Sequence, residues 1–142
     1  MLVLDASVVL KWLVNDPHVE ADTDLASDLM RRVLTEGEEI LQPVHWLAEV
    51  AAVLSRLSPK SAARDIEMLH ALELPVRDDV TTYSRACQLA VDLNRHVFDT
   101  LYHAVALETD SAILVTADVR YARAARSVGR IVELADWGVS AN

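Results

Sequence analysis

Five short runs rich in apolar and β-branched residues alternate along the chain with longer stretches of helical periodicity. The runs are Leu2 to Leu4, Glu39 to Gln42, Pro75 to Arg77, Ala112 to Thr116 and Ile131 to Leu134. This alternation is typical of parallel strands joined by crossover helices. We therefore expect an α/β fold, with a central parallel sheet of about five strands flanked by helices.

Helix signals fill the intervals between these runs. The predicted helices cover about residues 7–14, 44–57, 80–94, 99–108 and 118–128, and a further helix starts at Ser58-Pro59. Ser7 and either Asp78 or Asp79 serve as N-caps, and Gly129 ends the last helix. Neither a linker nor an internal repeat interrupts the 142 residues, so we expect a single domain over residues 1–142.

The composition excludes several classes of protein. Hydrophobic residues make up 52% of the chain and Gly and Pro together only seven residues, which excludes a disordered or low-complexity chain. The longest apolar run is far shorter than the ~20 residues that span a bilayer, and the N-terminal segment does not resemble a secretory signal. We expect a cytoplasmic protein with no membrane segment. Cys87 is the single cysteine, which excludes an intrachain disulfide.

The formal net charge is −9, which argues against broad, sequence-independent adhesion to nucleic acid. The acidity is local, because eight of the 22 acidic residues lie between Asp16 and Glu39, against two of the 13 basic residues. We expect this segment to be a solvated face rather than a metal site. A polyanionic substrate stays possible where a basic face or bound cations reverse the field.

Two acidic residues directly follow apolar strand runs. Asp5 follows the first run and Asp118 the fourth, and each has a hydroxyl residue two positions away, Ser7 and Thr116. Ligands of open α/β sheets bind beyond the carboxyl ends of the strands, which makes both acids candidates for a site. Two structural alternatives stay open: Asp5 begins a turn, and Asp118 is a helix N-cap.

Two further acids, Glu49 and Asp99, lie within apolar helical stretches. Glu49 should face a cleft or the edge of the core, and for Asp99 a purely structural role at a helix N-terminus is the alternative. Four converging carboxylates would raise one another's pKa unless cations bound among them. Oxygen ligands select Mg²⁺ or Mn²⁺, and a pair of such ions can activate water in phosphodiester hydrolysis.

The four acids lie in the segments Val3 to Val9, Leu47 to Val50, Phe98 to Leu107 and Leu114 to Asp118. In this order and spacing, these segments resemble the acidic motifs of PIN-domain nucleases, and most closely those of VapC-like toxins of toxin–antitoxin pairs. The resemblance implies a Mg²⁺- or Mn²⁺-dependent endoribonuclease in which the four acids are catalytic and bind the metal, supported by Ser7 and Thr116. It also implies an RNA substrate, a small antitoxin partner and a homodimer.

Other residues carry weaker expectations. Arg120, Arg123 and Arg126 form a basic stripe beside Asp118, which is either a solvated surface or a contact to RNA phosphate or a partner. His103 occupies a position that is commonly apolar in the family, and we expect it on the rim near Asp99. Cys87 is expected to be buried in helix packing.

Three alternatives to a PIN-type nuclease stay open. A phosphoacceptor receiver domain has a similar size and acidity, but it should show adjacent acids after the first strand and a lysine after a late strand. Here Asp5 stands alone, and the lysines Lys11 and Lys60 lie in the first half of the chain. The others are a PIN-like binding module without catalysis, which would normally have lost one of the acids, and an unrecognised metal-dependent phosphohydrolase.

Overall fold

The computed structural model describes residues 1–14, 16, 18 and 21–137. The strands are β1 (Leu2–Leu4), β2 (Gln42–Pro43), β3 (Val76–Arg77), β4 (Ile113–Thr116) and β5 (Ile131–Glu133). The helices are α1 (Ala6–Val14), α2 (Thr23–Glu36), α3 (Trp46–Leu57), α4 (Ala62–His70), α5 (Val80–Leu93), α6 (Val97–Leu107), α7 (Val119–Ala125) and α8 (Leu134–Trp137), with a 3₁₀ turn η1 (Arg126–Val128). The predicted α/β class is confirmed.

The strands form a three-stranded parallel sheet and a separate parallel pair. The main sheet has the order β1-β4-β5, and β2 pairs only with β3. A single bridge between Leu2 and Ile40 connects the two groups. The prediction that about five strands form one sheet is therefore wrong, because β1 pairs through its backbone only with residues 39–41, just ahead of β2, and not with β2 itself.

The side chain of Gln42 makes hydrogen bonds to β1 in place of backbone pairing. Its Oε1 accepts a hydrogen bond from Leu4 N at 2.9 Å, and its Nε2 donates to Leu4 O at 2.9 Å. Gln42 is fully buried, so these bonds satisfy two backbone groups that have no water available. The side-chain amide thus joins β2 to the end of β1.

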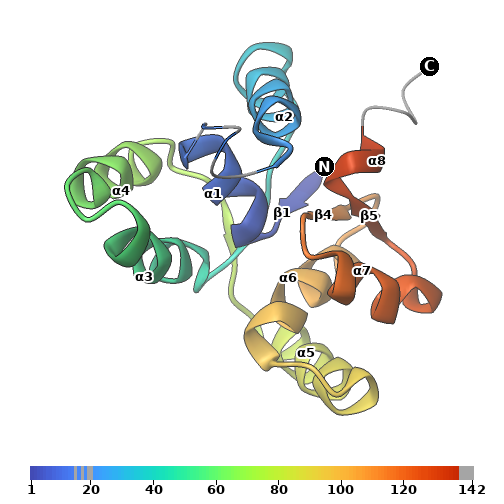
Figure 1. Ribbon diagram of the computed structural model, residues 1–142. Coiled ribbons are helices and arrows are strands. Elements are labelled where there is room, and N and C mark those ends of the chain that lie inside the picture. Colours follow the sequence, from blue (N-terminus) through green and yellow to red (C-terminus); the bar gives the residue numbers. More distant parts are fainter. Residues whose placement is uncertain (15, 17, 19–20, 138–142) are drawn as a thin grey trace.

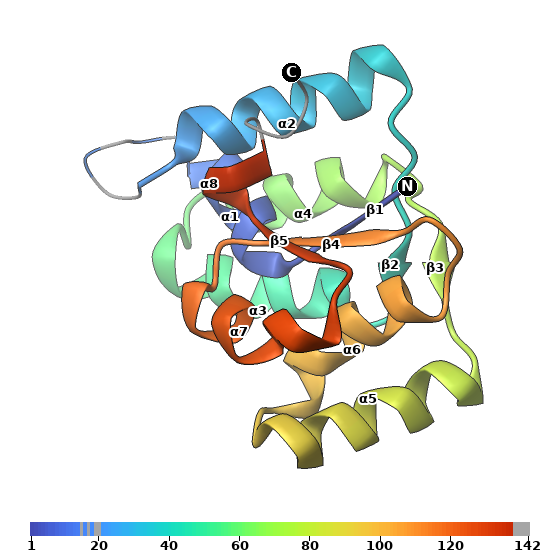
Figure 2. The same cartoon turned by 90° about the vertical axis from the view of Figure 1, so that its right-hand side faces the viewer.

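Helices cover both faces of the main sheet. Figure 1 shows the strands in the centre, with α1 and α2 on one side and α6 and α7 on the other. Figure 2 shows α5 outside α6, farther from the sheet. The main core packs both strands and helices, whereas a small second cluster joins α5 to α6 through Ala86, Leu89, Leu101 and Ala104.

The helix boundaries agree with the predictions at most positions. Asp79 caps α5, and its side chain accepts a hydrogen bond from Thr82 N. The segment predicted as one helix over residues 118–128 instead changes from α7 to η1 at Arg126. Pro59 lies in a turn ahead of α4, which begins three residues later than predicted because the carbonyl of Ser58 first accepts bonds from Ser61 N and Ala62 N.

Of the predictions about exposed and buried residues, that for the acidic segment is confirmed and that for Cys87 is wrong. The described acidic residues between Asp16 and Glu39 are exposed, as predicted, whereas Glu20 lies outside the described residues. Cys87 is exposed on the outer side of α5, so its predicted burial is wrong. Only one side of α5 packs on α6, and the opposite side faces water. Within the described ranges, no helix has the length and apolarity needed to cross a membrane.

Replacing Gln42 with Leu should strongly destabilise the fold. The substitution keeps the buried volume but leaves Leu4 N and Leu4 O without partners, at a cost of about 1–3 kcal/mol for each group. We expect urea unfolding to show a loss of about 2–5 kcal/mol in the free energy of unfolding. The matched control is Gln88→Leu on the exposed surface of α5, which should change it by less than about 0.5 kcal/mol. Equal losses in the two variants would contradict the bridging role of Gln42.

Candidate active site

Asp5 lies at the junction between the main sheet and α1. Its backbone N donates to Val115 O at 3.0 Å, and its carbonyl accepts from Val8 N at 3.0 Å, which starts α1. The turn predicted as the structural alternative is therefore present. The backbone bonds to β4 and to α1 fix the position from which the Asp5 carboxylate projects beyond the carboxyl end of β1.

Two hydroxyl groups hold the Asp5 carboxylate on one of its oxygens. Ser7 Oγ and Thr116 Oγ1 both donate to Asp5 Oδ2, the latter at 2.8 Å. Each hydroxyl also accepts a backbone N–H from the segment after β4, from Ala117 for Ser7 and from Asp118 for Thr116, both at 3.0 Å. This network ties the ends of β1 and β4 together and leaves Asp5 Oδ1 without a hydrogen bond from the described residues.

Asp118 is the N-cap of α7. Its Oδ1 accepts hydrogen bonds from Arg120 N at 2.9 Å and Tyr121 N at 3.0 Å. The structural alternative for Asp118 is thus realised, but it occupies only one of the two carboxylate oxygens. The N-cap bonds fix the direction of the side chain while Oδ2 stays available to a ligand.

Glu49 lies in the first turn of α3, and two side chains orient it. Tyr102 OH donates to Glu49 Oε2 at 2.8 Å, and His45 Nε2 lies 3.4 Å from the same oxygen. Burial raises the pKa of Glu49, but the hydrogen bonds from His45 and Tyr102 outweigh it and hold this pKa below its ordinary value. Glu49 is therefore a charged carboxylate at neutral pH.

Asp99 lies in the first turn of α6 and is half-buried. No described side chain or backbone group donates a hydrogen bond to its carboxylate. Burial first, and then the negative charges of Glu49 and Asp118, raise the pKa of Asp99, while His96 and Arg95 counteract part of this rise. Asp99 is thus the one carboxylate of the four to which no described group donates a hydrogen bond.

The four predicted acids interact electrostatically. Burial raises the pKa of Asp5 to about 6 against the hydrogen bonds from Ser7 and Thr116, and the charges of Glu49 and Asp99 add to the rise. Asp99 in turn interacts with Glu49 and Asp118. Two strand ends and two helix N-termini therefore place their acids in one neighbourhood. Repulsion of this kind is relieved when a cation binds among the carboxylates.

The four carboxylates are not arranged as a metal coordination shell in this structure. Among the residues that the structure describes, no group of three or more His, Cys, Asp or Glu side chains stands in an arrangement that could hold a metal ion. The donor set is nevertheless made of oxygens only, with unused oxygens on Asp5, Asp99 and Asp118. Such a set suits a hard divalent cation such as Mg²⁺ or Mn²⁺ once the side chains turn toward it.

Some surrounding residues differ from the sequence-based expectations. His103 is fully buried, with Nδ1 3.1 Å from Tyr121 OH and Nε2 2.7 Å from Gly129 O, so its expected place on the rim is wrong. The three arginines of the stripe, Arg120, Arg123 and Arg126, are exposed on α7 and η1.

The sequence analysis missed the contacts that His45 and Tyr102 make with Glu49. Tyr102 lies 53 positions from Glu49 in the sequence, so no local sequence pattern could predict this contact. His45 lies four positions before Glu49, a spacing that places two side chains on one side of a helix. That spacing was a signal that could have identified His45.

Replacing Asp5 with Asn should stabilise the metal-free protein at pH 7–8. The pKa of Asp5 is about 6 in the folded protein and about 3.9 in an unfolded chain, so the folded state binds the proton more strongly. As the pH rises from about 4 to about 6, Asp5 loses its proton and the free energy of unfolding of the wild-type protein falls. Above about pH 6 the wild-type protein keeps this full loss of stability. We expect a gain on the order of 1–3 kcal/mol at pH 7–8 that fades toward pH 4.

Thermal melts of both proteins in excess chelator, from pH 4 to 8, measure this difference. Asp110→Asn, which replaces an exposed acid, serves as the matched control. A difference between wild type and the Asp5→Asn variant that stays constant across this pH range would contradict the raised pKa of Asp5.

Comparison with known proteins identifies the family. The PIN domain family model matches residues 2–127, a range that contains all four acids and most of the 142 residues. No curated protein sequence matches the chain significantly. PIN domains are generally nucleases, and the match decides against the phosphoacceptor receiver alternative. The fold, the order of the acidic segments and this match together show that the chain belongs to the PIN domain family.

Proposed function

We propose that this PIN domain is an endoribonuclease that hydrolyses RNA phosphodiester bonds with the help of Mg²⁺ or Mn²⁺. In this proposal Asp5, Glu49, Asp99 and Asp118 bind the metal and are the catalytic acids. The observation that carries it is the arrangement of these carboxylates: Thr116 links Asp5 to the backbone of Asp118 through hydrogen bonds, and Tyr102 links Glu49 to α6, the helix that carries Asp99. In this arrangement the negative charges repel one another. The uncompensated negative charge there is unfavourable in the protein alone and favourable around a divalent cation.

The chain's own residues would prepare the carboxylates for this role. Ser7 and Thr116 orient Asp5 through one oxygen and leave the other to a ligand. Tyr102 holds Glu49 in the same manner, with 2.8 Å between the phenol oxygen and Oε2. A divalent cation in this set would activate a water molecule and stabilise the charge on the leaving oxygen.

The basic stripe on α7 and η1 would guide RNA to these acids. Arg120, Arg123 and Arg126 are exposed and follow directly after Asp118, on a protein whose net charge is −9. Because overall charge repels a polyanion, a local basic face is needed beside the acids. We propose that the stripe contacts RNA phosphates near the site of cleavage.

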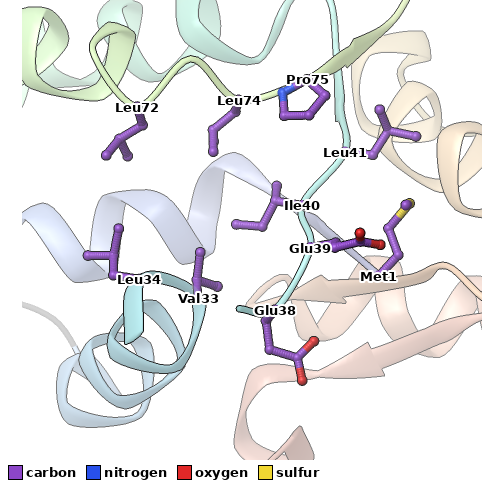
Figure 3. Close-up of a pocket in the computed structure, with 10 residues that line it drawn as sticks. All are labelled: Met1, Val33, Leu34, Glu38, Glu39, Ile40, Leu41, Leu72, Leu74 and Pro75. Atoms are coloured by element: carbon purple, nitrogen blue, oxygen red, sulfur yellow. The ribbon is translucent and has the colours of Figure 1, made fainter. Parts of the chain in front are cut away.

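We further propose that the protein is the toxin of a toxin–antitoxin pair, in line with its VapC-like motifs. An apolar groove of about 430 Å³ supports a protein partner. Figure 3 shows Leu72 and Leu74 facing Val33 and Leu34 across this groove. Glu38 and Glu39 also line this groove, which would receive an apolar segment of a small antitoxin with basic flanks. Co-purification with the product of a neighbouring reading frame tests this, and no binding of that product would count against it.

The remaining parts of the proposal concern assembly and location. We propose that residues 1–142 act as one PIN domain, in the cytoplasm, and that two copies form a homodimer. Apolar side chains such as Val80 and Val91 are 78% and 77% exposed on the outer side of α5, which leaves apolar surface for a second copy. Light scattering at tens of micromolar protein tests the dimer, and a monomer mass would contradict it.

The Asp99→Asn variant should lose RNA cleavage without losing its fold. The substitution keeps the size of the side chain and removes one negative charge from the proposed cation site, so we expect a fall in cleavage rate of at least about a hundredfold. Excess chelator should abolish wild-type cleavage, and added Mg²⁺ or Mn²⁺ should restore it. Mg²⁺ should also raise the melting temperature of wild type more than that of the variant, because it binds only the folded site.

The matched control is Asp92→Asn, which replaces an exposed acid on α5 and should cleave RNA at the wild-type rate. Cleavage by the Asp99→Asn variant in excess chelator at the wild-type rate would contradict the metal mechanism. If wild type with Mg²⁺ or Mn²⁺ leaves RNA intact, the alternative of a PIN-like binding module without catalysis holds instead.

A further inference from the structure

Aromatic rings gather at the N-terminus of α6. The ring of Phe98 lies 5.3 Å from that of His45 with an interplanar angle of 25°, and 5.0 Å from that of His96 with an angle of 36°. His45 also meets Tyr102 edge to face at 4.9 Å. We call Phe98 and His96, the two exposed members of this group, the aromatic platform.

The platform adjoins the candidate active site. Phe98 directly precedes Asp99, and the Phe98 carbonyl lies 3.1 Å from His45 Nε2, the nitrogen that also approaches Glu49. His96 acts electrostatically on both Glu49 and Asp99. A group lying on the platform would therefore lie next to the acids that are proposed to cleave the RNA backbone.

Phe98 lies outside the hydrophobic core of the described residues. Phe98 is the single phenylalanine of the sequence and is 50% exposed, whereas Trp46 is only 5% exposed. The Phe98 ring stacks on that of His45, and Phe98 is absent from both hydrophobic clusters of the described residues. Exposed aromatic surface beside a group of carboxylates proposed to cut RNA is typical of a place where a base stacks.

We propose that Phe98 and His96 form a stacking site for one nucleobase of single-stranded RNA, next to the phosphodiester bond that is cut. The inference rests on the proposed ribonuclease function and adds to it the way in which the substrate is held. The flat rings offer stacking without a preference for sequence, because every base has a π-face. Bases inside a duplex are already stacked on their neighbours, so this site selects unpaired nucleotides.

A cation beside the aromatic platform would favour binding of the same nucleotide through its phosphate. Arg95 is half-buried between α5 and α6, and its Nη2 donates to Arg120 O at 3.3 Å, which places it at the start of the basic stripe. Its charge acts on Asp99. A nucleotide that stacks on the platform would thus have a guanidinium close to its phosphate, as in grooves that bind single-stranded nucleic acid.

A direct test compares AMP with ribose 5-phosphate, which lacks the base but keeps the sugar and phosphate. In NMR titrations of the wild-type protein, AMP should shift the ring signals of Phe98 and His96, and ribose 5-phosphate should not. Phe98→Leu should weaken AMP binding about tenfold, and Phe98→Tyr should restore it. Tyr83→Leu, which removes an exposed ring from α5, is the matched control and should bind AMP as wild type does. Equal shifts with both compounds would overturn the stacking site.

Cleavage kinetics separate stacking from a purely structural role of Phe98. Loss of a stacking contact should raise the KM for single-stranded RNA about tenfold in Phe98→Leu and change kcat by less than about threefold. If Phe98 serves only to position His45 and Glu49, kcat falls and KM stays constant, which would overturn the proposal. A wild-type protein that cuts no RNA would contradict the proposed function, and the AMP titration, which requires no cleavage, would then still decide the stacking site.

Discussion

The parallel pairing of β1 with β4 is the constraint on which the rest of the structure depends. It brings together two strand ends that are separated by 111 positions between Asp5 and Thr116. Ser7 and Thr116 then cross-link these ends through Asp5 Oδ2 and the backbone of residues 117 and 118. Without this pairing, neither the position of Asp5 nor the N-cap of α7 at Asp118 would be defined.

The other two acids depend on helix placement. α6 packs against β1, β2 and β4, and α3 packs against α1. The start of α3 meets the first turn of α6, where His45 Nε2 lies 3.1 Å from the Phe98 carbonyl oxygen. Helix N-termini carry partial positive charge, which helps to hold Glu49 and Asp99 as anions in a partly buried place. Tyr102 couples the two helices directly, because it lies on α6 and donates to Glu49 on α3. The site is therefore a product of the whole packing arrangement and not of one loop.

Much of this arrangement could be predicted from local patterns. Apolar runs followed by an acid identified the ends of β1 and β4, and Asp79 and Gly129 act at helix ends as their residue types favour. Interactions between distant residues could not be predicted in this way. Gln42 bridges β1 and β2, and His103 is buried between Tyr121 and Gly129, yet nothing in their neighbouring residues distinguishes them from surface polar groups. The number of strands in the main sheet was overestimated for the same reason, since β2 and β3 form a separate pair and the side-chain amide of Gln42 joins β2 to β1.

The central claim is that Asp5, Glu49, Asp99 and Asp118 share a divalent cation. Anomalous X-ray diffraction from crystals grown with Mn²⁺ measures this most directly, because the signal locates the ion independently of any activity. The account predicts a Mn²⁺ peak within coordination distance of carboxylate oxygens of Asp5 and Asp99, and no peak there in crystals of the Asp99→Asn variant. A fully occupied Mn²⁺ site elsewhere on the protein, with these four carboxylates uncoordinated, would contradict it.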